Sequence, residues 1–314
     1  MPVLLRVSAI FLEICLPIIV LMAAGWGIDR KFKLDLNTMV RLNLYLLVPC
    51  FIFVRIYGSD ATIRRDGPIV LFTLTMLALL FGLCALAGRR LPAAQRKSMM
   101  LAMFYNCGNF GIPLVALAFG KEAQRIQVFA LLAMNISTFS VGLLIAAAQG
   151  GGDGAEGRSR RATLLLLLRQ PSIYAITAAF VCKALPIGDL REVPWVWTPL
   201  EFAASALIGF ALITLGVQLS KTRPSAIRLP VVLTLAIKLL IAPLVAWPLT
   251  RLFGFDATTS AVLIAGTSAP TAINTALLAH EFKGDSQFAA SAVFYSTVLS
   301  VVTVTIVLAL LGVR

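Results

Sequence analysis

Apolar residues are gathered along the chain into long runs that short polar segments separate. A membrane-spanning helix needs roughly 17 to 25 predominantly apolar residues. Because 59% of the residues are hydrophobic and only 13% are charged, a soluble core could not absorb these runs. The pattern predicts an all-α polytopic membrane protein with ten transmembrane helices, at about residues 7–28, 39–57, 67–87, 98–119, 125–148, 171–187, 196–219, 229–250, 258–279 and 287–312.

The first run resembles a signal peptide, because Arg6 precedes an apolar stretch that ends in Ala23-Ala24-Gly25. Its apolar part is longer than the roughly 7 to 15 residues of a signal peptide. We therefore predict that it is the first helix. Its one acidic residue, Glu13, either reaches the membrane interface or pairs with a neighbouring arginine.

The fourth run is interrupted by residues that a regular helix does not favour. Between Tyr105 and Gly120 it carries two Asn, two Gly and Pro113. Proline lacks a backbone donor, and glycine permits conformations that a helix excludes. In hydrocarbon a broken helix needs partners for its backbone groups. We therefore expect the break to line a cavity.

The ninth run repeats this feature, because Gly266, Pro270 and Asn274 interrupt residues 258–279. Pro113 and Pro270 are 157 residues apart, which is half of the 314-residue chain. An odd number of helices in each half means that the halves insert upside down relative to each other. Paired interruptions in such halves are typical of the binding site of a secondary transporter.

The long polar segment at residues 149–170 divides five predicted helices from five. Its stretch Gly152-Asp-Gly-Ala-Glu-Gly157 has the spacing of a dinucleotide-binding loop, but it follows a membrane helix and lies in no strand-turn-helix unit. Its composition is that of a flexible linker. We predict a first five-helix repeat at 1–148, a cytoplasmic linker, and a second five-helix repeat at 171–314.

The basic residues predict how the chain lies in the membrane. Lys and Arg outnumber Asp and Glu by 27 to 14. With the loops assigned to alternate sides, 16 of these cations fall on one side and 10 on the other, and Lys238 lies inside a helix. The positive-inside rule places the richer side in the cytoplasm, with both termini outside it. We attribute the charge to topology and to membrane lipids, and expect no nucleic-acid partner.

Two polar residues in the predicted spans have more than one interpretation. Asn135 is either a contact between helices or part of a binding site, because polar groups in hydrocarbon serve both purposes. Lys238 lies about ten residues from either end of its helix, where a cation needs a partner. It either neutralises the carbonyl end of a half-helix or contributes an anion contact or an ion relay.

The residues near the two interruptions favour an anionic ligand. The N-terminus of a half-helix presents unpaired N–H groups and partial positive charge, which suits an anion. No Asp or Glu occurs at the centre of a predicted span, so we expect a site for organic anions. Side chains near the interruptions that could donate hydrogen bonds are those of Asn106, Asn109, Asn274, Ser268 and Thr271.

The same residues argue against several enzymes and against metal or cofactor binding. A sodium/proton antiporter or an aspartyl protease would need central acidic residues, and a metalloprotease would need His-Glu-x-x-His. The chain has one histidine, His280, at the predicted end of a helix, and five cysteines without metal-ligand spacing. We expect no catalytic residues, no metal and no cofactor.

Four phrases of this sequence resemble the auxin efflux carrier family in its bacterial form, which is related to the plant PIN carriers. They are Asn106-Cys-Gly-Asn-Phe-Gly-Ile-Pro113, Leu46-Leu-Val-Pro49, Leu212-Ile-Thr-Leu-Gly216-Val-Gln-Leu219 and Ser268-Ala-Pro270-Thr-Ala-Ile-Asn274. The resemblance implies a five-plus-five inverted repeat, with an architecture like that of sodium/proton antiporters or bile-acid transporters. Helices 4 and 9 would be broken and crossed. Helices 1, 2, 6 and 7 would form a scaffold that dimerises, and helices 3–5 and 8–10 a transport domain that moves as an elevator.

The resemblance also implies a function. Family substrates are organic anions, including auxin in plants and malate- or malonate-like acids in bacteria. By motif, Asn109, Pro113 and Pro270 are the strongest site candidates. Asn106, Ser268, Thr271 and Asn274 follow from their position, and Lys238 and Asn135 from their depth. We expect a secondary exporter of small organic anions in the inner membrane; the alternatives are a proton- or sodium-coupled dicarboxylate importer and a membrane receptor or scaffold that moves nothing.

Overall fold

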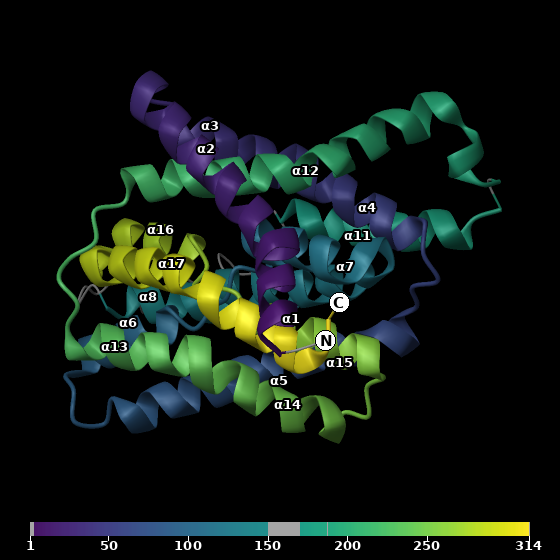
Figure 1. Ribbon diagram of the computed structural model, residues 1–314. Coiled ribbons are helices and arrows are strands. Elements are labelled where there is room, and N and C mark those ends of the chain that lie inside the picture. The colour runs from purple at the N-terminus through teal and green to yellow at the C-terminus, as the bar shows by residue number, and fades with distance from the viewer. Residues whose placement is uncertain (1–2, 150–169, 187, 314) are drawn as a thin grey trace.

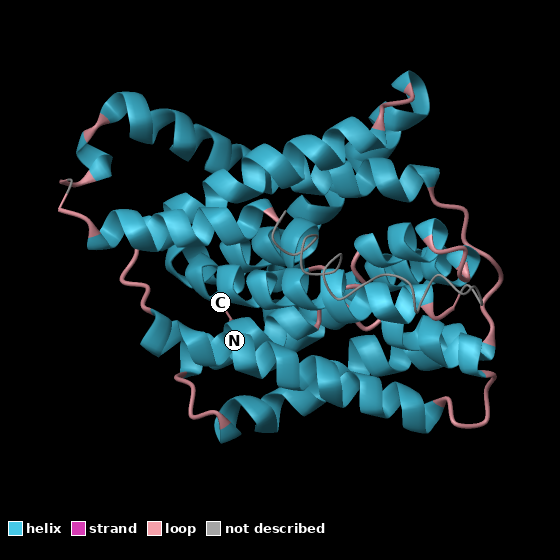
Figure 2. Cartoon of the chain, turned by 180° about the vertical axis from the view of Figure 1, so that it is seen from behind, coloured by secondary structure: helices cyan, strands magenta, loops and turns pink. Residues whose placement is uncertain are grey.

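The computed structural model describes residues 3–149, 170–186 and 188–313, and every regular element in these residues is a helix (Figures 1 and 2). Most of the predicted linker, residues 150–169, lies outside the described residues, as does its glycine-rich motif. The first part of the chain contains α1 (Val3–Ile10), η1 (Phe11–Cys15), α2 (Leu16–Phe32), α3 (Leu36–Leu42), η2 (Asn43–Leu47), α4 (Val48–Tyr57), α5 (Ile63–Ala87), α6 (Ala93–Leu101), η3 (Cys107–Gly111), α7 (Ile112–Ser137), η4 (Thr138–Gly142) and α8 (Leu143–Ala147).

The second part of the chain is also built from long apolar helices with short connections. It contains α11 (Pro171–Ala184), η5 (Leu190–Glu192), α12 (Pro194–Lys221), α13 (Leu229–Ala236), η6 (Ile237–Ile241), α14 (Ala242–Leu252), α15 (Ala257–Thr267), α16 (Asn274–Glu281) and α17 (Ser286–Leu311). Apart from η5, which is a 3₁₀ turn, the η elements are single π-helical turns that lie within or at the start of longer helices.

Seven continuous helices in the described residues are long and apolar enough to cross a membrane: Leu5–Phe32, Leu36–Tyr57, Ile63–Ala87, Cys107–Ala147, Pro194–Lys221, Leu229–Leu252 and Ser286–Leu311. The sequence pattern predicts ten. The fourth of these has 41 residues and bends at Gly120, whose φ of 78° and ψ of −173° suit a residue without a side chain. Two more predicted spans are not among the seven. The sixth corresponds to α11, which has only 14 residues and is about 21 Å long, and the ninth is interrupted.

The helices are arranged in layers (Figure 1). The four helices α2, α4, α11 and α12 gather along one side, and α5, α13 and α14 lie along the opposite side, with α7, α16 and α17 between them. The two chain ends meet, because Arg6 Nε donates to the carbonyl oxygen of Val313 at 3.4 Å. The middle layer contains both interrupted segments, because α7 and α16 begin shortly after them.

Two glycines let α2 and α12 approach closely. A Cβ atom on Gly216 would overlap the carbonyl of Met22, and a Cβ atom on Gly25 would overlap the carbonyl of Ile213. Small residues at such a crossing replace hydrophobic attraction with close van der Waals packing, as is common in membrane helices. This contact joins the first long helix to a helix of the second half of the chain.

The sequence prediction placed the first interruption between Tyr105 and Gly120, with Pro113 as one of its causes, and the structure corrects this. The helix ends at Leu101, residues 102–106 are not helical, and Pro113 lies in the first turn of α7. The π-helical turn η3 directly precedes α7, so the continuous helix Cys107–Ala147 contains this proline without a break. Pro270, by contrast, lies in the non-helical stretch between α15 and α16.

Candidate functional site

The two non-helical stretches, residues 102–106 and 268–273, cross and pair with each other. Tyr105 and Thr271 form an antiparallel β-bridge, the one isolated bridge in the described residues. The backbone hydrogen bonds of the crossing are Asn106 N–H to Pro270 O at 2.8 Å and Ala272 N–H to Phe104 O at 2.7 Å. Each stretch therefore supplies the backbone partners that the other lacks, which is what an unwound segment needs inside a membrane protein.

Thr271 holds the crossing together, whereas Ser268 bonds within its own helix. Thr271 Oγ1 donates to the carbonyl of Ala102 at 2.9 Å, and its N–H donates to Ser296 Oγ at 3.0 Å. Ser268 Oγ donates to Ile264 O at 2.9 Å within its own helix. Both side chains are fully buried, so their hydroxyl groups are already used by the fold.

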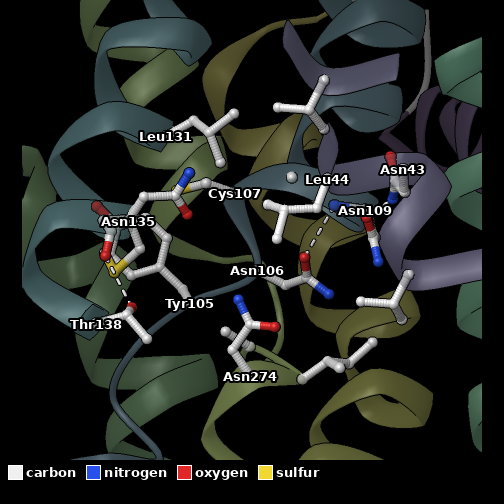
Figure 3. A pocket seen from close by; sticks show the side chains of 16 residues that line it. Asn43, Leu44, Tyr105, Asn106, Cys107, Asn109, Leu131, Asn135, Thr138 and Asn274 are labelled. Atoms are coloured by element: carbon white, nitrogen blue, oxygen red, sulfur yellow. Dashed lines mark hydrogen bonds between the residues drawn. The ribbon is translucent and has the colours of Figure 1, made fainter. Parts of the chain in front are cut away.

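A cavity of about 90 Å³ lies beside the crossing (Figure 3). Its walls come from α3, η2, the start of α4, residues 105–109, the middle of α7, η4 and the start of α16. The chain has six asparagines, and all but Asn37 line this cavity: Asn43, Asn106, Asn109, Asn135 and Asn274. Four of these five were predicted as site residues, and they come from three segments that are distant in sequence. Of the remaining candidates, Pro113, Pro270, Thr271, Ser268 and Lys238 do not line the cavity.

Three of the asparagines are connected by hydrogen bonds. Asn43 Nδ2 donates to Asn109 Oδ1 at 2.7 Å, and Asn106 Oδ1 accepts from the N–H of Asn109 at 3.0 Å. The bond from the backbone N–H fixes the amide orientation of Asn106, because only the amide oxygen can accept it. In the structure Asn106 Nδ2 and Asn43 Oδ1 are buried and have no partner. A hydrogen-bond acceptor on a ligand in the cavity would satisfy Asn106 Nδ2, which would remove the penalty of leaving that donor unpaired.

The other two asparagines lie elsewhere on the wall. Asn135 Nδ2 donates to Ser172 Oγ at 3.3 Å, so Asn135 contributes both a contact between helices and a part of the cavity. Asn274 begins α16, is partly exposed, and makes no side-chain hydrogen bond to a described residue. Figure 3 shows its amide beside that of Asn106. Asn274 is therefore the most available donor of the set.

The electrostatics of the cavity come from helix ends and amides. The helical segment that begins at Cys107 and the helix α16 both start at the cavity wall, so the partial positive charge of two helix N-termini is directed to it. None of the described lining residues carries a charge. This arrangement suits a small anion that accepts hydrogen bonds.

Lys238 lies behind the cavity. It is fully buried, its Nζ donates to the carbonyl of Thr267 at 2.7 Å, and the Nζ atom lies 4.9 Å from the centre of the Tyr105 ring. Thr267 is the last residue of α15. Of the interpretations that the sequence left open, the contact with the carbonyl end of a half-helix is therefore present, and Lys238 has no direct access to the cavity.

Sequence reasoning missed Asn43 and Thr138 as lining residues. Each is the first residue of a π-helical turn, η2 and η4. Such turns add a residue to the helix, change which side chains face inward, and are frequent at functional sites. For Asn43 a signal existed: it is an asparagine inside a predicted span, like the other four. For Thr138 no comparable signal is present in the sequence.

A second group of charged residues lies away from the cavity, where α4 ends and α5 begins. Arg125 pairs with Asp66, and both side chains are buried. Asp60, on the connecting loop, pairs with Arg65, and the hydrogen bond from Arg65 holds the pKa of Asp60 below its ordinary value. Lys183 donates to the carbonyl of Ser59 at 2.6 Å. These contacts join α5, α7 and α11 and involve no cavity asparagine.

Comparisons with known proteins match nearly the whole chain. The family described as membrane transport protein matches residues 10–308. The chain is similar to an uncharacterized transporter of Methanothermobacter thermautotrophicus, with 25% identity over 300 residues, 93% of this chain and 95% of the relative. It is also similar to an uncharacterized transporter of Methanocaldococcus jannaschii, with 23% identity over 282 residues and 86% of each chain. The matched residues include both interrupted helices and the cavity.

The resemblance of the four sequence phrases to the auxin efflux carriers is thus confirmed. The family match and the long apolar helices show that the chain is a multi-pass membrane protein, and the matched family is one of transporters and not of enzymes. The chain belongs to the membrane transport protein family, which is the auxin efflux carrier family.

Proposed function

We propose that this protein is a secondary transporter of small organic anions, and that the asparagine cavity beside the crossing is its binding site. The observation that carries the proposal is the cavity wall, which combines two helix N-termini and five amides with no charged side chain. The unpaired amide of Asn106 supports it further, because that N–H group is buried and free to donate. A carboxylate is the common organic group that accepts several such bonds.

We propose that the cavity changes sides by an elevator motion. The cavity lies between η2, which precedes α4, and the group formed by residues 105–109, α7 and α16. The hydrogen bond between Asn43 and Asn109 joins these two groups and is a contact that the motion would break. In this proposal the predicted spans 1, 2, 6 and 7 (residues 7–28, 39–57, 171–187 and 196–219) form the scaffold, which would dimerise. The predicted spans 3–5 and 8–10 carry the substrate.

The ten-helix inverted repeat and the topology belong to the same proposal. The interrupted helices α6/α7 and α15/α16 would occupy equivalent places in two five-helix repeats, residues 1–148 and 171–314, and both termini would lie outside the cytoplasm. Export of auxin-like or dicarboxylate anions through the inner membrane is the direction we propose. Cysteine labelling from each side of the membrane, at an introduced cysteine in the 33–35 connection between α2 and α3, would test the orientation.

The test of the site uses proteoliposomes and labelled indole-3-acetate, malate and malonate, with and without an imposed potential. The most informative variant is Asn274→Asp, because it keeps the shape of a side chain that makes no hydrogen bond to a described residue. A carboxylate about 5 Å from a bound anion, at an effective dielectric constant of about 20, costs roughly 3 kcal/mol, or about a hundredfold in flux. Asn109→Ala should also abolish flux, since it removes a lining amide and the bond to Asn43.

The matched control is Asn37→Asp, because Asn37 is exposed and is the one asparagine outside the cavity. We expect its flux to equal that of the wild type. Normal anion flux in Asn274→Asp would contradict the assignment of the site. If none of the three anions moves through folded, reconstituted wild type, while one of them binds, the receptor alternative becomes the better account.

A further inference from the structure

The buried amine of Lys238 has no anionic partner in the part of the chain that the structure describes. It lies in the π-helical turn η6 and makes one hydrogen bond, to the carbonyl of Thr267. No described carboxylate lies within ion-pair distance of its amine. A full charge at this depth is costly unless a partner, water or a ligand compensates it. The single helix end at Thr267 supplies only a partial negative charge.

Lys238 is separated from the cavity by one layer of side chains. The ring of Tyr105 lies 4.9 Å from its Nζ atom and also lines the cavity, as does Cys107 two residues further along. An anion beside Asn106 and Asn274 would therefore lie just beyond this layer. Through a dry layer that thin, attraction between the two charges is strong, because little water screens it.

The other titratable groups on the packed elements do not compete for this role. Tyr105 faces Lys238 from the interrupted segment, and the buried Cys107 two residues further along carries a neutral thiol. None of the remaining titratable residues on the helices packed against η6 interacts with it, namely Arg64, Arg65, Asp66 and Cys84 of α5, Arg251 of α14 and Tyr295 of α17.

We propose that Lys238 is the proton-binding site of the transporter, neutral when the cavity is empty and protonated when an anion occupies it. A proton from water then adds to the Nζ lone pair as the anion enters, and leaves again when the anion leaves. Protonation of Lys238 and binding of the anion favour each other to the same extent, because binding linkage is reciprocal. The inference rests on the proposed function, and it makes proton and anion move in the same direction.

The first test needs no substrate. Thermal unfolding of purified wild type and Lys238→Met is compared from about pH 7 to about pH 9, where an unfolded lysine keeps its proton. If the empty folded protein holds the neutral amine, it binds fewer protons than the unfolded chain, so the wild type gains stability relative to Lys238→Met as the pH rises. Methionine has a similar size and keeps the site packed. A stability difference that stays constant over this range overturns the proposal.

The control for this experiment is Lys97→Met. Lys97 also donates to a carbonyl at the end of a helix, that of Ala148 at 2.7 Å, but it is only partly buried and does not contact Tyr105. We expect the stability difference between the wild type and Lys97→Met to be independent of pH over the same range. A pH dependence equal to that of Lys238→Met would show that burial beside the cavity is irrelevant and would also overturn the proposal.

The second test uses malonate, which stays fully ionised above about pH 7. Its affinity for wild type should fall by at least about tenfold between about pH 7 and about pH 9, whereas Lys238→Arg, which keeps its charge, should change by less than about twofold. In proteoliposomes with a pH-sensitive dye inside, malonate entry should acidify the lumen in wild type and not in Lys238→Arg. Malonate binding that is independent of pH in wild type contradicts the coupling. If malonate does not bind at all but the stability test succeeds, malonate is removed as a substrate and the proton site stands.

Discussion

The buried pair of Arg125 and Asp66 gives a stability prediction that can be worked from the structure. The side chains are 9% and 3% exposed. Asp66→Asn keeps the shape, and the amide oxygen can still accept from the N–H of Thr62, as Asp66 does at 3.0 Å. What it removes is the charge that faces Arg125. Leaving one partner of a buried pair uncompensated costs about 3–5 kcal/mol.

We expect a value at the lower end of this range, because Asp60 lies 3.7 Å from Arg125 Nε and compensates part of its charge. About 3 kcal/mol corresponds to a fall in melting temperature of roughly 6 °C for a chain of this size. The assay is thermal unfolding in detergent, followed with a thiol-reactive dye. The dye responds to unfolding because three of the five cysteines are buried: Cys15, Cys84 and Cys107.

The control is Asp189→Asn, which removes the partner of Arg191 in an exposed pair whose side chains are 31% and 55% accessible. Such pairs contribute about 0–1 kcal/mol, so its melting temperature should stay within about 2 °C of the wild type. The double variant Asp66→Asn/Arg125→Gln should recover part of the stability, since no uncompensated charge remains. If Asp66→Asn melts together with the Asp189→Asn control, the reasoning about the buried pair is refuted.

Two further predictions concern packing and the cavity. Gly216→Ala should destabilise the protein by about 1–3 kcal/mol in the same melting assay, because its Cβ atom would overlap the carbonyl of Met22. Gly209→Ala on the same helix, where a Cβ atom meets nothing within 4 Å, should be neutral or stabilising; equal losses would argue against the close approach of α2 and α12. A Leu44→Cys variant places a thiol at a partly exposed position of the cavity wall, so malonate should slow its maleimide labelling and leave that of an Asn37→Cys variant unchanged; equal rates with and without malonate would place the anion elsewhere.

Much of the site was predictable because its residues are exceptional in their surroundings. Asparagine is costly in hydrocarbon, so Asn106, Asn109, Asn135 and Asn274 stand out within apolar runs. The same argument extends to Asn43, which was not predicted as a site residue. The interruption near Pro270 was predictable from proline and small residues. For these positions local chemistry was sufficient.

What could not be predicted depends on contacts between distant segments. Pro113 was assigned to the break, yet it lies in the first turn of α7, because the break is stabilised by backbone pairing with residues 270–272 and not by proline itself. The π-helical turns that position Asn43 and Thr138 have no sequence signature that separates them from ordinary helix. Seven continuous helices stand against ten predicted spans partly because one helix of 41 residues, which bends at Gly120, covers most of the predicted fourth and fifth spans.

The pairing of residues 104–106 with residues 270–272 also affects how the protein must be made. A ribosome completes the first interrupted stretch long before it synthesises the second. During this time the N–H of Asn106 and the carbonyl of Phe104 lack their hydrogen-bond partners in residues 270–272. The N–H of Thr271 in turn waits for Ser296, on the last helix. Until α17 has been inserted, the nascent chain therefore contains a polar seam, by which we mean the unpaired backbone groups of these two non-helical stretches within the membrane. Truncated products should be recognised by membrane quality control at this seam, and a chain cut before residue 270 should be degraded even though its own helices are intact.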